Sequence, residues 1–148
     1  MHTGEPQRGD VVVFDHPGQP YPLVKRVIGL PGDTIEIQDD YVYLNGHRLD
    51  YEGLGNTEHA RLFTEELPGH PHSIMLSPGR PSRRFFGPIT IGDGELLVLG
   101  DNRDNSLDSR YIGLVARTEL RGKAVGNVFS VNPDSWAPRF DRFVSPLK

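Results

Sequence analysis

The sequence predicts an all-β protein of mixed or antiparallel sheets, with a smaller β subdomain inserted into the main core. The apolar runs are short, and turn signals separate them. The 148 residues include 17 glycines and 13 prolines, which is a high content of turn-forming residues. No segment shows a sustained helical period, and residues 115–120 have room for a turn or two at most.

The first part of the core is predicted to contain three strands. Residues 11–14 form a continuous apolar run before the Pro17-Gly18 turn, which is typical of a buried strand. Residues 23–28 are predicted to form a second strand, which ends at another Pro-Gly turn. Residues 34–38 alternate polar and apolar side chains, as expected for a strand exposed on one face.

A β-hairpin is predicted next. Residues 41–44 run directly into Asn45-Gly46, and the returning strand would be residues 47–49. Asn-Gly is the strongest short-range hairpin signal, because both residues tolerate the positive φ that a two-residue hairpin turn requires.

From residue 50 to residue 84 the pattern is looser, with candidate strands at 61–67 and 73–76. We therefore expect residues 39–91 to form the inserted variable subdomain, and residues 1–38 and 92–148 to form the discontinuous core.

Three further strands are expected. Residues 89–91 lie at the end of the insertion, residues 95–99 and 122–131 belong to the core, and residues 100–110 form a polar loop between the last two.

Composition excludes several classes of protein. The net charge of −4 and pI of about 5.8 argue against a nucleic-acid partner, which normally meets a basic surface. The absence of cysteine excludes disulfides, thiol nucleophiles and cysteine-based metal sites. No apolar run approaches the roughly 18 residues that span a bilayer, so we expect neither a signal peptide nor an anchoring helix in the chain as written. No cofactor and no metal site are predicted.

A lysine lies inside the second predicted strand. On a strand, Lys25 shares one face with Leu23 and Val27, because side chains alternate between faces. If that face is buried, desolvation lowers the pKa of the amine, and a neutral amine can act as a general base. The alternative is that Lys25 and Arg26 extend to water from an edge strand, and spacing alone favours this alternative.

The polar loop, residues 100–110, holds three aspartates, two asparagines, two serines and two arginines. One interpretation is a structural turn, since Asp and Asn side chains bond to nearby backbone groups. A calcium loop starting at Asp101 is excluded, because Arg103 and Ile112 occupy its third and twelfth positions. The third interpretation is a charge-balanced support for a catalytic site.

Three segments together resemble the sequence boxes of bacterial type I signal peptidases: residues 8–14, residues 25–33, and residues 100–113 with the string GDNRDNSLDSR. The resemblance implies a membrane-anchored serine endopeptidase that removes signal peptides from exported preproteins with a Ser/Lys dyad on an all-β fold. It also implies signal peptides and the membrane surface as partners. The full-length protein would sit in the bacterial cytoplasmic membrane, with this domain on the periplasmic or outer side.

The resemblance assigns roles to residues of this chain. Lys25 would be the general base, and Ser106 would hydrogen-bond and orient its amine. Two ion pairs would brace the polar loop, and a short segment would lie beside the extended substrate. The ion pairs would be Arg26 with Asp101 and Asp108 with Arg110. The segment beside the substrate would be Pro22, Leu23 and Val24.

The family's nucleophile lies in a Ser-x-Ser-Met-x-Pro box before the first of these segments. No serine precedes Arg8, and the faintly similar residues 73–78 follow the lysine box instead. We therefore expect a truncated chain that is inactive alone. The alternatives are a noncatalytic peptide-binding relative or a related Ser/Lys pilin-processing peptidase. A further hypothesis places Phe129, Trp136, Phe140 and Phe143 at a membrane interface.

Overall fold

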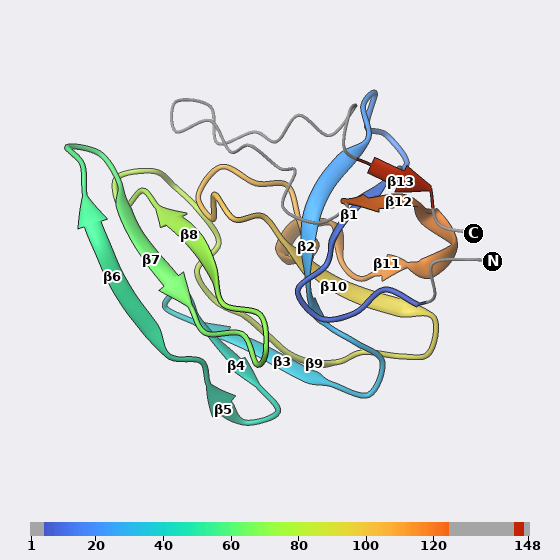
Figure 1. Ribbon diagram of the computed structural model, residues 1–148, viewed down its shortest axis with the longest axis horizontal. Helices are drawn as coiled ribbons and strands as arrows, with labels where there is room; N and C mark the ends of the chain where they lie inside the picture. Colours follow the sequence, from blue (N-terminus) through green and yellow to red (C-terminus); the bar gives the residue numbers. More distant parts are fainter. Residues whose placement is uncertain (1–4, 125–143, 147–148) are drawn as a thin grey trace.

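The computed structural model describes residues 5–124 and 144–146, and these form three β-sheets (Figure 1). The strands are β1 Val11–Phe14, β2 Leu23–Gly29, β3 Thr34–Gln38, β4 Tyr41–Leu44, β5 His47–Arg48, β6 Tyr51–Asn56, β7 Arg61–Glu65, β8 His72–Leu76, β9 Phe86–Thr90, β10 Glu95–Leu99, β11 Val115–Ala116, β12 Leu120–Ala124 and β13 Val144–Pro146. The helical turns are α1 Ser109–Ile112 and a 3-10 turn at Arg117–Glu119. The predicted all-β fold is confirmed.

The largest sheet has six strands in the order β11-β10-β2-β1-β12-β13, with antiparallel neighbours throughout. The strand β2 lies inside this sheet, paired with β1 along one edge and with β10 along part of the other. Val27 and Ile28, which point to opposite faces of β2, are both fully buried, as expected for a strand that is covered on both faces.

Two smaller sheets complete the fold, with strand orders β5-β4-β3-β9 and β6-β7-β8. The hairpin between β4 and β5 has the predicted turn. Asn45 and Gly46 have φ values of 53° and 86°, as a type I′ turn requires at both central positions.

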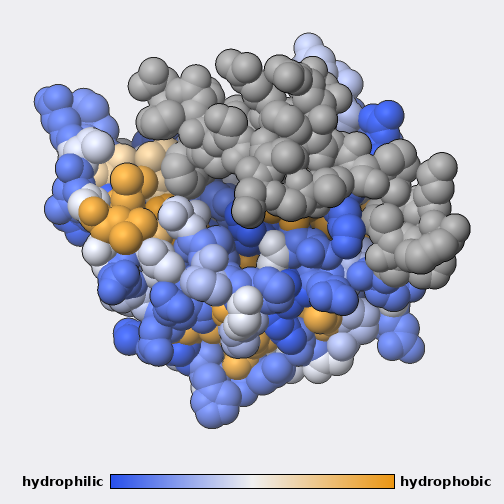
Figure 2. Space-filling model, in the orientation of Figure 1, coloured by the Kyte–Doolittle hydropathy of each residue, from blue (hydrophilic) through white to orange (hydrophobic). Residues whose placement is uncertain are grey.

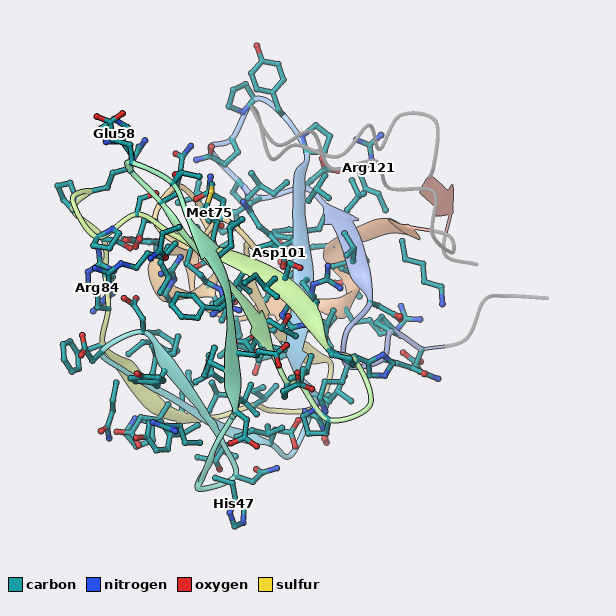
Figure 3. The ribbon with its side chains drawn as sticks, turned by 60° about the vertical axis from the view of Figure 1, so that its left-hand side comes forward. His47, Glu58, Met75, Arg84, Asp101 and Arg121 are labelled. Carbon is teal, nitrogen blue, oxygen red and sulfur yellow. The ribbon has the colours of Figure 1, made fainter. Side chains whose placement is uncertain are left out.

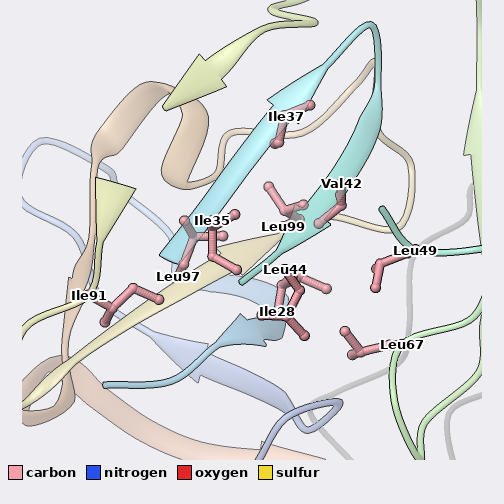
Figure 4. Close-up of a cluster of buried hydrophobic side chains, with 10 residues drawn as sticks. All are labelled: Ile28, Ile35, Ile37, Val42, Leu44, Leu49, Leu67, Ile91, Leu97 and Leu99. Carbon is pink, nitrogen blue, oxygen red and sulfur yellow. The ribbon is translucent and has the colours of Figure 1, made fainter. Parts of the chain in front are cut away.

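Two apolar clusters form the core, one on each face of β2. Ile28 belongs to the larger cluster, which also contains Leu97 from β10 and Ile35 from β3 (Figure 4). Val27 belongs to the second cluster, with Val12 from β1. Neighbouring residues of one strand thus bury their side chains in different clusters, because successive side chains point to opposite faces.

The expected boundary at residues 38/39 passes through a sheet and a cluster. The strand β3 pairs with both β4 and β9, which lie within residues 39–91. Val42 and Leu44 of β4 pack in the same cluster as Ile28 and Leu97. The division into a core and an inserted subdomain therefore stays a prediction, and the two parts share apolar packing.

The structure contains four elements that the sequence did not predict, the strands β6, β11 and β13 and the turn α1. The strand β6 contains Gly53 and Gly55 and is mostly exposed, so it lacks an apolar signal and forms by backbone pairing with β7. The turn α1 begins inside the polar loop, where the Asp108 carboxylate accepts a hydrogen bond from Arg110 N (3.1 Å). The part of the last expected strand after residue 124, and Phe129, Trp136, Phe140 and Phe143, lie outside the described residues.

The described residues on the face seen in Figure 2 are mainly hydrophilic, with separate hydrophobic areas between them. Among the described residues, no helix has the length and apolar character needed to cross a bilayer.

The first prediction concerns the larger cluster. Leu97→Ala should lower the free energy of unfolding by about 2–5 kcal/mol, because Leu97 is fully buried and the substitution leaves a cavity. The control is Leu54→Ala in β6, where the side chain is 51% exposed and the change should stay within about 0.5 kcal/mol. Urea unfolding measures both, and similar losses in the two variants would contradict the described packing.

Candidate functional site

Lys25 belongs to β2, the strand that contributes side chains to both apolar clusters of the core. Its position on β2 pairs with Val12 of β1, and the residue is partly buried. Burial lowers the pKa of the Lys25 amine below its ordinary value, since desolvation penalises the ammonium form. Asp108 and Asp101 oppose this effect by their negative charges, and Arg110 adds to it. The amine is therefore less protonated at a given pH than that of an ordinary surface lysine.

Gly100 brings Lys25 and Ser106 together. A Cβ atom added at Gly100 would overlap Ser106 Oγ and would lie 3.5 Å from Lys25 Nζ. The side-chain hydroxyl of Ser106 is buried and makes no hydrogen bond with the described residues. The expected juxtaposition is therefore present, but the expected hydrogen bond between Ser106 and Lys25 is not formed in this structure. The role of Ser106 stays a prediction.

The expected ion pair between Arg26 and Asp101 is formed. The guanidinium donates from Nε to Oδ1 (3.0 Å) and from Nη2 to Oδ2 (2.8 Å), a two-point contact that fixes both planes. Arg26 also donates to the Gly9 carbonyl (2.9 Å). In Figure 3, Asp101 lies between β8 and β2, in agreement with the bond from Met75 N to Asp101 O (2.9 Å).

The second expected ion pair, Asp108 with Arg110, is formed and buried. Arg110 donates from Nε to Oδ1 (2.9 Å) and from Nη2 to Oδ2 (2.8 Å). Asp108 also accepts from the Gly100 backbone N–H (3.0 Å). Burial alone would raise the pKa of Asp108, but these bonds overcome that effect and hold it below its ordinary value. The carboxylate thus remains charged and holds the turn at Gly100.

The strand β2, which contains Lys25, has an open edge at Val24. The last pair between β10 and β2 joins Leu99 and Arg26, so β10 does not reach Val24. Val27 N–H donates to Asp10 O on the β1 side, and backbone groups alternate along a strand, so the N–H and C=O of Val24 point away from β1. Among the described residues no strand pairs with this edge. Pro22, Leu23 and Val24 are partly buried beside it.

A buried polar network that the sequence did not reveal lies behind the loop. Arg103 donates from Nη1 to Glu65 Oε2 (3.0 Å) and from Nη2 to Glu65 Oε1 (2.7 Å). Glu65 also accepts from the Tyr51 hydroxyl (2.5 Å) and faces His72 Nε2 (3.0 Å). Glu65 and Arg103 lie 38 positions apart, and no local pattern predicts their contact.

Glu65 and Arg103 keep each other charged, and the Tyr51 hydroxyl stays protonated. Burial would raise the pKa of Glu65, but Arg103 and His72 more than compensate and hold it below its ordinary range. Burial would lower the pKa of Arg103, and Glu65 reverses that effect. Burial and the neighbouring Glu65 carboxylate raise the pKa of Tyr51, so its hydroxyl keeps the proton that it donates.

The Lys25 amine is a group at this site that can transfer a proton. In the described part of the chain, no three His, Asp or Glu side chains are grouped so that they could hold a metal ion. A separate cleft of about 400 Å³ lies elsewhere, lined by residues that include Asp40, Tyr51 and Arg84. Neither Lys25 nor Ser106 lines it. The chemistry available at the site is therefore that of a partly buried amine beside a strand edge.

Comparisons with known proteins agree on one family. Residues 1–129 match the family model described as signal peptidase, peptidase S26. A signal peptidase I of Bacillus licheniformis is 34% identical over 133 residues, covering 88% of this chain and 63% of that protein. A signal peptidase I of Pseudomonas aeruginosa is 37% identical over 162 residues, covering 94% of this chain and 55% of that protein.

A solved structure agrees with the sequence comparisons. The crystal structure of a signal peptidase I from Enterococcus faecalis matches with a TM-score of 0.53 and 29% identity. The match covers 82% of this chain and 98% of the chain in that structure. This chain spans between about half and just under two thirds of the length of the curated relatives described above. On the family model and these relatives, the chain belongs to the signal peptidase family, peptidase S26.

Proposed function

We propose that this chain forms the lysine-bearing part of a signal peptidase I, a serine endopeptidase that removes signal peptides from exported preproteins. The observation that carries the proposal is the partly buried Lys25 amine, held with Ser106 against Gly100 beside an open strand edge. The protein would act at the bacterial cytoplasmic membrane, with this domain on the outer side.

In the proposed reaction, neutral Lys25 removes the proton from a serine hydroxyl, and the serine oxygen attacks the carbonyl carbon of the scissile bond. The lysine then returns this proton to the departing amine, which leaves an acyl-enzyme. Water hydrolyses the ester, again with Lys25 as the base. The serine would come from a Ser-x-Ser-Met-x-Pro segment, which residues 1–148 do not contain.

The open edge of β2 is the proposed substrate site. An extended peptide would add a strand there by bonding to the outward N–H and C=O of Val24, which is a common mode of peptide recognition. Pro22 and Leu23 would lie along the same peptide. This pairing would place a scissile bond near Lys25, the next residue on the strand.

The two ion pairs would support the amine. The Arg26–Asp101 pair would hold the start of the loop to the lysine strand, and the Asp108–Arg110 pair would hold the Gly100 N–H. Ser106 would bond to the Lys25 amine when the substrate is bound. Such support fixes the orientation of reacting groups.

The pKa of Lys25 is directly testable, because the chain has three lysines, Lys25, Lys123 and Lys148. The Cε resonance of Lys25, assigned by its loss in Lys25→Met, should titrate below 10.5, the ordinary lysine value. In the pH range between the lowered pKa and 10.5, the unfolded chain binds a proton at Lys25 that the folded chain does not, so the contribution of Lys25 to the free energy of unfolding should rise with pH there. A Lys25 midpoint at the ordinary value would remove the basis of the proposal.

Cleavage is the second test. The chain of residues 1–148 should not cleave a preprotein, whereas the chain extended by a segment with Ser-x-Ser-Met-x-Pro should. In that extended chain, Lys25→Met should lower kcat/KM by about 10²–10⁴-fold, as expected for loss of a general base.

The control for that test is Lys123→Met, since Lys123 and Lys25 both pair with Val12, from opposite sides of β1. Lys123→Met should leave cleavage unchanged. Binding of a signal peptide to the extended chain without any Lys25-dependent cleavage would instead favour the peptide-binding alternative.

The third test concerns Gly100. In the serine-bearing chain, Gly100→Ala should lower kcat by about 100-fold, because the added Cβ would overlap Ser106 and displace it from the amine. The control is Gly79→Ala, where an added Cβ meets no atom within 4 Å. Equal activity in the two variants would show that the contact at Gly100 has no catalytic consequence.

A further inference from the structure

We infer that Glu65, in the third sheet, is a positioning residue for the Lys25 site and acts through Arg103 on the turn at Gly100. The inference rests on the proposed function and adds a residue to it. Glu65 lies within residues 39–91, the part of the chain that the sequence predicted to be a variable insertion.

The first step is the geometry of Arg103. Two nitrogens of its guanidinium bond to the two oxygens of Glu65, and the third, Nε, donates to the Gly100 carbonyl (3.0 Å). Because the guanidinium is planar and rigid, fixing two of its nitrogens also fixes the third. The orientation of the Glu65 carboxylate therefore determines where the Gly100 carbonyl is held.

The second step is that Glu65 is itself held in place. Glu65 of β7 pairs with His72 of β8. One nitrogen of the His72 ring faces the Glu65 carboxylate (3.0 Å), and the other faces the His70 carbonyl (2.9 Å). The Tyr51 hydroxyl donates to the same carboxylate. Glu65 is fully buried and Arg103 is 3% exposed, so water does not compete for these bonds.

The third step is that the loop is attached to the same sheet through its backbone. Met75 N donates to Asp101 O (2.9 Å), and Arg103 N donates to Met75 O (3.0 Å). Ser77 N donates to the Asp104 carboxylate (2.5 Å). The loop therefore runs beside β8 like an added strand, and Gly100 lies where it leaves the main sheet after β10.

These contacts converge on one residue of the site. Gly100 has its carbonyl held by Arg103 and its N–H held by Asp108, and it touches Ser106 and comes close to the Lys25 amine. If Arg103 releases the carbonyl, the turn can move away from these side chains and water can reach the amine. A buried ion pair is weak evidence for stability as such, so the fixed geometry is the better explanation for its presence.

The test uses the chain of residues 1–148 and the Cε titration of Lys25. The variant Glu65→Gln/Arg103→Gln removes both charges at once, so the net charge near the site does not change. We expect its Lys25 midpoint to rise by about one pH unit toward 10.5, because water relieves part of the desolvation. The matched control is Arg8→Gln/Asp33→Asn, which removes another ion pair with no bond to Gly100, and its midpoint should equal that of the wild type.

A second variant separates positioning from stability. Glu65→Met/Arg103→Met replaces the buried pair with apolar side chains of similar length, a change that often preserves or raises stability. We expect a folded protein whose Lys25 midpoint rises, with a urea midpoint lowered only by the loss of the bonds that Glu65 makes to Tyr51 and His72. If the Gln/Gln or Met/Met variant folds and its Lys25 titration midpoint equals that of the wild type, the inference is overturned. An ordinary midpoint already in the unaltered chain counts against the proposed function instead, so the two failures are distinguishable.

Discussion

The contact of Gly100 with Ser106, next to the Lys25 amine, is the constraint on which the rest of the site depends. A hydrogen atom is the only side chain that fits there, since a Cβ would overlap the Ser106 hydroxyl. The backbone of this residue is fixed in both directions, because Asp108 accepts its N–H and Arg103 donates to its carbonyl. The Lys25 amine lies close to this turn, and its burial lowers its pKa.

The polar loop keeps many charges buried because nearly every charge has a partner. Asp108 faces Arg110 and Arg103 faces Glu65, each through two parallel hydrogen bonds. Leaving one member of such a pair unpaired would be costly, so the pairs fix the path of the loop more strongly than apolar packing alone would. Three buried side-chain atoms have no hydrogen-bond partner among the described residues, namely Asn102 Oδ1, Asp104 Oδ1 and Ser106 Oγ, and the last of these is the one beside the Lys25 amine. It lies where the proposed chemistry needs a group free to bond the amine.

Much of the fold could be predicted from local pattern. The alternation of residues 34–38, the apolar run at β10 and the Asn45-Gly46 turn each report a local preference, and each gives the predicted element. The pattern failed at β6, whose glycines and exposed side chains carry no apolar signal, since that strand depends on its pairing with β7. The division of the chain at residue 38 stays a prediction, and Val42 of β4 packs in the same cluster as Ile28 of β2.

The sequence by itself determined that the protein is all-β and that Lys25 shares a strand face with Val27. The order of residues from Gly100 to Arg110 was also enough to indicate the family. Only the tertiary structure decided that the Lys25 amine is partly buried, with Gly100 and Ser106 close to it although they lie far along the chain. Likewise, Glu65 and Arg103 meet only because β7 and the loop are brought together, and desolvation depends on such distant contacts rather than on neighbours in sequence.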